Sequence, residues 1–239
     1  MAFTDKVELK DFGKMDEEYQ HLLKRVLAIQ SDCEIGGPHL YVKDILLNAP
    51  TPTEKLIVAR TAAEEIDHFR KMAKLAAELG VDVSYVLQWS NQQRYVEAFR
   101  GQITTWEDYA IFGFLIDRVG RYQLEEFVGC SYTPLDKALP IILKEEEGHV
   151  AHGRDTTAAL AQDTEESRKR IQESLNRWYP QALDMFGNSE SRRSERFVYW
   201  GIKRRTNGQA RQDYIAEVNP MIAEMGLEVP DPTTGRHYF

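Results

Sequence analysis

Cysteine is scarce in this chain, which has only Cys33 and Cys130 among its 239 residues. The two cysteines form no zinc motif and no redox motif, so we expect no disulfide framework and interpret both as small buried residues. Long apolar runs are lacking, and the N-terminus has neither the basic start nor the apolar stretch of a secretory signal. These absences predict a soluble protein whose location is cytoplasmic.

Positive charge is also in short supply. The 30 lysines and arginines are outnumbered by 38 aspartates and glutamates, which gives a net charge of −8. This sign argues against a nucleic-acid groove, because binding to phosphates depends on lysine and arginine. Strand-like alternation is lacking too, whereas apolar side chains recur at helical spacing through most of the chain. We therefore predict an all-α fold that binds neither nucleic acid nor membrane.

Start and stop signals divide the chain into helical segments. Thr51 with Glu54, and Thr104 with Glu107, have the spacing of capping boxes, which begin helices. Gly36-Gly37-Pro38 is expected to end the first helix and Gly80 the second. The expected helices cover residues 15–35, 51–80, 84–99, 104–128, 133–160, 165–185, 192–204 and 209–225.

The motif Glu-x-x-His occurs twice, ending at His68 and at His149. Residues three apart share a helix face, so each motif presents one oxygen and one nitrogen ligand together. An acidic residue precedes the glutamate of each motif at a similar distance, Glu34 by 31 residues and Asp117 by 29. Two helical hairpins with three ligands each make a four-helix bundle. We expect a single domain over residues 1–239, with the bundle at about 13–162 and C-terminal helices at about 163–239.

The acids and histidines of these motifs fall on otherwise apolar helix stripes, which points them inward. Burying an ionised carboxylate without a partner is costly, and a metal ion is the simplest partner. A single Glu-x-x-His motif usually lies on a solvent-exposed helix face. Two copies with upstream acids favour a site for two metal ions. Mixed carboxylate and imidazole ligation suits iron or manganese better than a structural zinc site. The predicted ligands are Glu34, Glu65, His68, Asp117, Glu146 and His149.

Four residues near the motifs are weaker candidates. Glu64, Glu145 and Glu147 fall off the apolar stripes, so we expect them to be solvated or to support the ligands. His152 lies three residues after His149, but this spacing offers no paired carboxylate. A ligand role for His152 is therefore disfavoured.

Several segments resemble one known family. They include Cys-Glu-Ile-Gly-Gly around Glu34, Glu-Ile-Asp-His ending at His68, Phe-Leu-Ile-Asp ending at Asp117 and Lys-Glu-Glu-Glu-Gly-His ending at His149. Later segments are Asn-Arg-Trp-Tyr-Pro-Gln-Ala-Leu-Asp-Met-Phe-Gly, Ile-Lys-Arg-Arg-Thr-Asn and Val-Pro-Asp-Pro. The chain resembles the catalytic A subunit of ring 1,2-phenylacetyl-CoA epoxidase, a diiron multicomponent oxygenase with a ferritin-like fold. That family also has aspartate, as at position 117, before its second motif.

The resemblance implies a cofactor of two iron ions held by the six residues named above, which act in catalysis through the metals. It implies dioxygen as co-substrate, electrons from a separate reductase, and insertion of one oxygen atom into an aromatic CoA thioester. It also implies a related non-catalytic subunit or a second copy of the chain as partner. This sequence ends soon after Val-Pro-Asp-Pro, whereas family members continue. The segment after Gly37 also differs in sequence from the family pattern. Substrate and subunit pairing therefore stay open.

Two alternatives remain beside this oxygenase. One is a self-sufficient diiron hydroxylase or oxidase that acts on another substrate. The other is a ferritin-like iron-binding protein without substrate chemistry. The complete set of inward acids argues against a degenerate scaffold, because such a scaffold has no reason to keep them.

Overall fold

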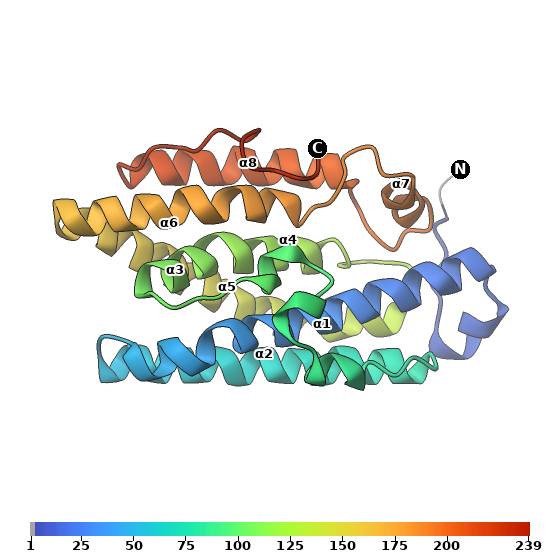
Figure 1. The fold of residues 1–239 in the computed structure, drawn as a ribbon. Helices are drawn as coiled ribbons and strands as arrows, with labels where there is room; N and C mark the ends of the chain where they lie inside the picture. The colour runs from blue at the N-terminus through green and yellow to red at the C-terminus, as the bar shows by residue number, and fades with distance from the viewer. Residues whose placement is uncertain (1–2) are drawn as a thin grey trace.

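The computed structural model describes residues 3–239 and is built from helices (Figure 1). Within this range there is no β-strand, and the one β contact is an isolated bridge between Val7 and Tyr132. The all-α prediction is confirmed. No helix in the described part is both long and apolar enough to cross a membrane. The main helices are α1 (Glu17–Asn48), α2 (Pro52–Glu78), α3 (Trp106–Ile111), α4 (Arg118–Glu125), α5 (Thr133–Asp163), α6 (Glu165–Asp184), α7 (Arg192–Tyr199) and α8 (Asn207–Glu224), with a π-helix, η5 (Phe112–Asp117), between α3 and α4.

Apart from the segment 84–99, the helices begin within two residues of the expected positions, with one change of cap. The hydroxyl of Thr51 accepts a hydrogen bond from the backbone N–H of Glu54 at 3.1 Å and begins α2. The carboxylate of Glu54 does not close the capping box, because it contacts Nε2 of His152 at 2.7 Å instead. The cap of α3 is Thr105, one residue later than predicted, and it accepts from the N–H of Asp108.

The predicted end of the first helix is wrong, because α1 runs through Gly36-Gly37-Pro38 to Asn48. Both glycines are buried, and a Cβ atom on Gly36 would lie 3.0 Å from the ring of Phe99. The glycines here allow an aromatic side chain to approach the helix backbone. Burial against Phe99 therefore maintains the helix at a position where propensity alone favours a stop.

The predicted helix over residues 84–99 is also wrong. The segment forms three short 3₁₀ turns, η2 (Ser84–Gln88), η3 (Asn91–Gln93) and η4 (Glu97–Arg100). Arg94 lies fully buried between them, with Nη1 at 2.7 Å from Oδ1 of Asp32 in α1. The backbone N–H of Tyr95 donates to the other oxygen of Asp32 at 2.8 Å. Because α1 satisfies these polar groups, the segment stays on α1 without forming a regular helix.

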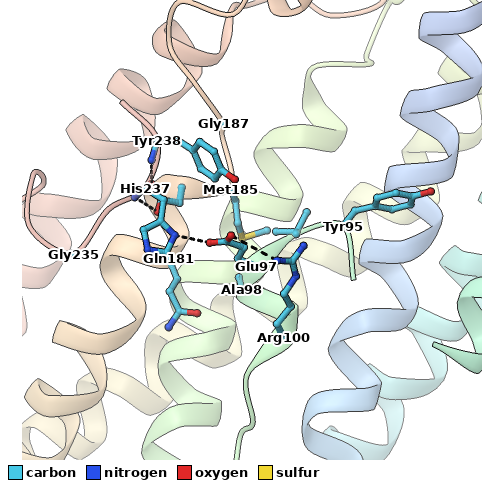
Figure 2. Close-up of a pocket in the computed structure, with 12 residues that line it drawn as sticks. Tyr95, Glu97, Ala98, Arg100, Gln181, Met185, Gly187, Gly235, His237 and Tyr238 are labelled. Atoms are coloured by element: carbon cyan, nitrogen blue, oxygen red, sulfur yellow. Dashed lines mark hydrogen bonds and ion pairs between the residues drawn. The ribbon is translucent and has the colours of Figure 1, made fainter. Parts of the chain in front are cut away.

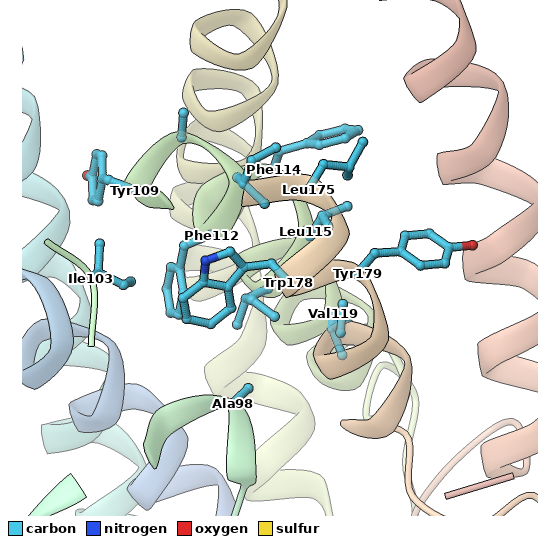
Figure 3. Packing of buried hydrophobic residues seen from close by; sticks show 14 of the residues in the cluster. Ala98, Ile103, Tyr109, Phe112, Phe114, Leu115, Val119, Leu175, Trp178 and Tyr179 are labelled. Atoms are coloured by element: carbon cyan, nitrogen blue, oxygen red, sulfur yellow. The ribbon is translucent and has the colours of Figure 1, made fainter. Parts of the chain in front are cut away.

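The C-terminal helices lie along the bundle on the side of α3 and α4, as Figure 1 shows for α6 and α8. Trp178 and Tyr179 of α6 are buried and share one apolar cluster with Phe112, Phe114 and Leu115 (Figure 3). Because this cluster joins the bundle to the C-terminal helices, we propose that the chain folds as one domain.

Candidate metal centre

The predicted ligands come from four helical elements and meet inside the bundle. The imidazole of His149 adjoins one of the predicted carboxylate ligands, since its Nδ1 lies 3.1 Å from Oε1 of Glu65. Asp117, at the end of η5, is half-buried and lines a small cavity together with Glu34, Glu65 and Glu146. All six residues therefore surround one centre, and metal binding by them stays a prediction. Four of the side chains are buried and offer ligand atoms within 4.8 Å of one another: Glu34, Glu65, His68 and Glu146.

Both imidazoles turn their Nδ1 atoms toward the carboxylates. Nδ1 of His68 lies 3.3 Å from Oε1 of Glu146 and 3.4 Å from Oε2 of Glu34. Nδ1 of His149 lies 3.6 Å from the other oxygen of Glu146. Both Nδ1 atoms are buried and have no hydrogen-bond partner. Buried polar atoms are rarely left unpaired, so two orphaned nitrogens among carboxylates fit a site for cations.

The outer nitrogen of each imidazole contacts the acid that precedes the glutamate of the other motif. Nε2 of His68 lies 2.8 Å from Oε2 of Glu145, and Nε2 of His149 lies 2.9 Å from Oε2 of Glu64. Helices α2 and α5 thus exchange two reciprocal contacts. An acceptor at the outer nitrogen fixes the orientation and tautomer of a ligating imidazole. Glu64 and Glu145 therefore support the histidines, whereas Glu147 is exposed.

The groups of the centre shift one another's pKa values. Burial lowers the pKa of His68 and His149, but nearby carboxylates outweigh it and raise these values to about 11 and about 12. Burial raises the pKa of Glu146, but the two imidazoles outweigh it and lower the value to about 2. Burial and the charge of Glu146 raise the pKa of Asp117 to about 8 and also raise that of Glu65. The negative charge of the centre therefore attracts protons where cations could bind.

Asp117 reaches the centre through a local irregularity. The predicted helix over 104–128 is interrupted by η5, and π turns occur mostly as single insertions, often at functional sites. A Cβ atom on Gly113 of η5 would lie 3.1 Å from Cα of Gly153 in α5, so the two backbones touch. Asp117 follows Gly113 by four residues, and His149 precedes Gly153 by four. In antiparallel elements this contact brings Asp117 and His149 to the same level.

A cavity of about 30 Å³ lies beside the carboxylates, with room for about one water molecule. On its polar side, Nε2 of Gln30 donates to Oε1 of Glu34 at 2.6 Å. None of the lining residues is exposed, and most of them are buried. Its apolar walls are formed by Tyr41, Phe99, Phe112, Ile116, Leu124 and Met185.

Sequence patterning missed three residues of this region. Gln30 lies one helical turn before Glu34, a spacing that indicates contact on a helix. Tyr41 and Met185 reach the cavity only through the tertiary fold, and no motif marks them. His152 lies outside the centre, as expected, since its Nε2 contacts Glu54.

Comparison with known proteins agrees with these features. The profile of the family described as "Phenylacetic acid catabolic protein" matches residues 7–238. The A subunit of 1,2-phenylacetyl-CoA epoxidase from Escherichia coli (strain K12) is 30% identical over 233 residues, which cover 94% of this chain and 75% of that protein. Component B of benzoyl-CoA oxygenase from Aromatoleum evansii is 24% identical over 216 residues, which cover 79% of this chain and 46% of that protein. Both relatives are oxygenase or epoxidase components, which supports the predicted enzyme class, and the chain belongs to the phenylacetic acid catabolic protein family.

Proposed function

We propose that this chain is the oxygen-activating component of a diiron monooxygenase. Its substrate in this proposal is an aromatic CoA thioester similar to phenylacetyl-CoA, and one oxygen atom is inserted into the aromatic ring. The names of the two relatives support the substrate class. The proposed iron ligands are Glu34, Glu65, His68, Asp117, Glu146 and His149.

One observation carries the proposal: two buried imidazole nitrogens without partners face a group of carboxylates. Four carboxylates bring a charge of −4, which two divalent ions would neutralise. Oxygen and imidazole ligands without thiolate favour iron or manganese. The cavity beside the carboxylates adds a largely buried place where a small molecule could react.

When bound, the two iron ions would supply the electrons and the coordination positions for dioxygen activation. The protein's own contribution is orientation and exclusion of water. Glu145 holds the outer nitrogen of His68, and Glu64 holds that of His149, so both Nδ1 atoms stay directed inward. Phe99 and Phe112 shield the carboxylates on the side of the cavity.

The reaction also sets requirements for partners. One atom of dioxygen enters the ring and the other leaves as water, which consumes two electrons and two protons. These electrons must be replaced after every turnover, so a separate reductase is part of the proposal. The relatives are named as parts of larger oxygenase or epoxidase enzymes, which supports a further protein partner.

The ligand assignment is tested by metal analysis of three proteins. Wild type is expected to bind two ferrous ions per chain, and Glu146→Ala to lose at least one of them. Glu147→Ala is the matched control, because Glu147 is adjacent in sequence but exposed. Equal iron content in all three proteins would refute the assigned site.

The substrate is tested with ferrous protein, a reductant and dioxygen. Phenylacetyl-CoA should increase oxygen uptake, and mass spectrometry should detect a product heavier by one oxygen atom. Labelling with ¹⁸O₂ should transfer one labelled atom to the product. Turnover of another substrate without added protein partners would instead support a self-sufficient hydroxylase or oxidase. Iron binding without any substrate oxidation, even with reductase added, would support an iron-binding protein.

A further inference from the structure

Three separate spaces in the protein share one lining residue, Met185. The first is an outer pocket of about 500 Å³ between η4, the end of α6 and the C-terminal segment (Figure 2). The second is the cavity of about 30 Å³ beside the carboxylates. The third, also of about 30 Å³, lies between α4 and the start of α8. Met185 lines all three, so it lies where the outer pocket and the cavity beside the carboxylates adjoin.

The backbone of Met185 is fixed, whereas its side chain has freedom to move. The residue caps the C-terminus of α6, and its carbonyl accepts a hydrogen bond from Nε2 of Gln123 at 3.2 Å. Gly187, two residues later, has φ of 76° and turns the chain away from the helix. The methionine side chain is unbranched with three rotatable bonds, so it can change rotamer without moving this turn.

The small volume of the inner cavity requires such a movement. A cavity that binds benzene in a protein core measures about 150 Å³, several times the space beside the carboxylates. An aromatic ring can therefore reach the carboxylates only if a wall of the cavity moves. Tyr41 and Phe112 are packed edge to face with each other and are fully buried, which makes them poor candidates. Gln30 is held by Glu34. Phe99, Ile116 and Leu124 are buried as well, which leaves Met185, half-buried and unbranched, as the flexible apolar wall.

We propose that Met185 is a gate through which the acyl end of the substrate passes from the outer pocket to the metal centre. This inference rests on the proposed function for the identity of the substrate, but the gate itself is a property of the cavities. In the closed state the thioether fills the passage. In the open state it withdraws, and the two spaces join.

Cys33 provides a reporter that does not depend on activity. It is half-buried, against the expectation that both cysteines are buried, and it lines the inner cavity but not the outer pocket. The other cysteine, Cys130, is buried and can be removed as Cys130→Ala. In this background Met185→Ala should increase the rate at which methyl methanethiosulfonate modifies Cys33 at least tenfold. Met225→Ala is the matched control, because Met225 is the C-cap of α8 and is buried elsewhere. Equal modification rates in the Met185→Ala and Met225→Ala proteins would overturn the gate.

The route of entry is tested by blocking one space at a time in the Met185→Ala protein. Gln181→Trp narrows the outer pocket, and Asn207→Trp narrows the third space. The gate predicts that only Gln181→Trp slows modification of Cys33. If Asn207→Trp alone slows it, the entry route is wrong. Circular dichroism melting of each variant separates a local opening from a general loss of stability.

Turnover distinguishes failure of the gate from failure of the proposed function. With phenylacetyl-CoA, Met185→Ala should change KM at least fivefold, whereas Met225→Ala should leave it unchanged. If wild type does not oxidise phenylacetyl-CoA, the proposed function fails while the modification of Cys33 still decides the gate. If wild type is active and Met185→Ala matches it in both assays, the gate fails alone.

Discussion

Gly113 and Gly153 face each other so closely that the Cβ atom of any other residue at position 113 would lie 3.1 Å from Cα of Gly153. The contact is one helical turn away from Asp117 on η5 and from His149 on α5. Two residues without side chains therefore set the distance between two predicted ligands. A side chain at either position has to push η5 and α5 apart.

Gly153→Ala should lower the metal content and the melting temperature, because its Cβ would overlap the backbone of Gly113 and Phe114. Gly148→Ala is the control in the same helix, since nothing lies within 4 Å of the added atom. That substitution should leave metal binding unchanged and stabilise α5 by up to about 1 kcal/mol. Metal analysis and thermal melting measure both effects. If both variants behave alike, the close contact has no role in assembling the centre.

Glu145→Ala should weaken metal binding roughly 10- to 100-fold, because the outer nitrogen of His68 loses its acceptor. Glu147→Ala removes a carboxylate of the same helix that is exposed, and its affinity should equal that of wild type. Competition with a chelator of known affinity measures the difference. Unchanged affinity in Glu145→Ala would show that the contact does not orient the imidazole.

The metal-free protein should lose stability as the pH rises from 6.5 to 9.5. The folded state raises the pKa of His68 to about 11 and of His149 to about 12, so it holds protons that the unfolded chain releases near pH 6.5. The raised pKa of Asp117, about 8, also makes the protein lose stability as the pH rises to and through 8. Stability from a raised pKa is present at low pH and is lost as the pH passes the folded value. Melting temperatures at several pH values measure the trend.

Bound metal should reverse this dependence, because ligation displaces the same protons and becomes stronger as the pH rises. The increase in melting temperature on adding ferrous ion under anaerobic conditions should therefore grow between pH 6.5 and pH 8. Asp117→Asn removes one titrating group and should flatten the metal-free curve in this range. A metal-free melting temperature that rises across the whole range would contradict the direction assigned to these groups.

A chain cut after Asp163 should fail to form a native core. It lacks Trp178 and Tyr179, which pack in one cluster with Phe112, Phe114 and Leu115. Exposing Phe112, Phe114 and Leu115 costs about 1.5–3 kcal/mol each, so together they remove much of the roughly 5–15 kcal/mol that stabilises a typical domain. A chain cut after Leu227 keeps α6 and α8 and should retain its near-ultraviolet circular dichroism. Cooperative melting of the shorter chain would show that the bundle is an independent domain.

The sequence predicts the parts of the centre that depend on helix periodicity. Glu65 and His68 share a face of α2 in any tertiary arrangement, and Glu146 and His149 share a face of α5 for the same reason. The continuation of α1 past Gly36 could not be predicted, because it depends on Phe99, which is distant in sequence. The 3₁₀ turns around Arg94 likewise follow from a buried ion pair with Asp32 that no local pattern indicates. Tertiary contacts outweighed local propensity in both places.

Because of the π-helix η5, the direction in which Asp117 faces depends on the exact number of residues in this segment. An α-helix advances about 100° per residue, so an inserted residue changes the facing of everything on one side of it. Deleting one residue between Gly113 and Asp117 would let a regular helix form, yet Asp117 would then be rotated by about 100° relative to Gly113 and would face away from the carboxylates as long as Gly113 keeps its contact with Gly153. A one-codon deletion would thus leave the composition and the helix content almost intact but remove Asp117 from the predicted metal centre.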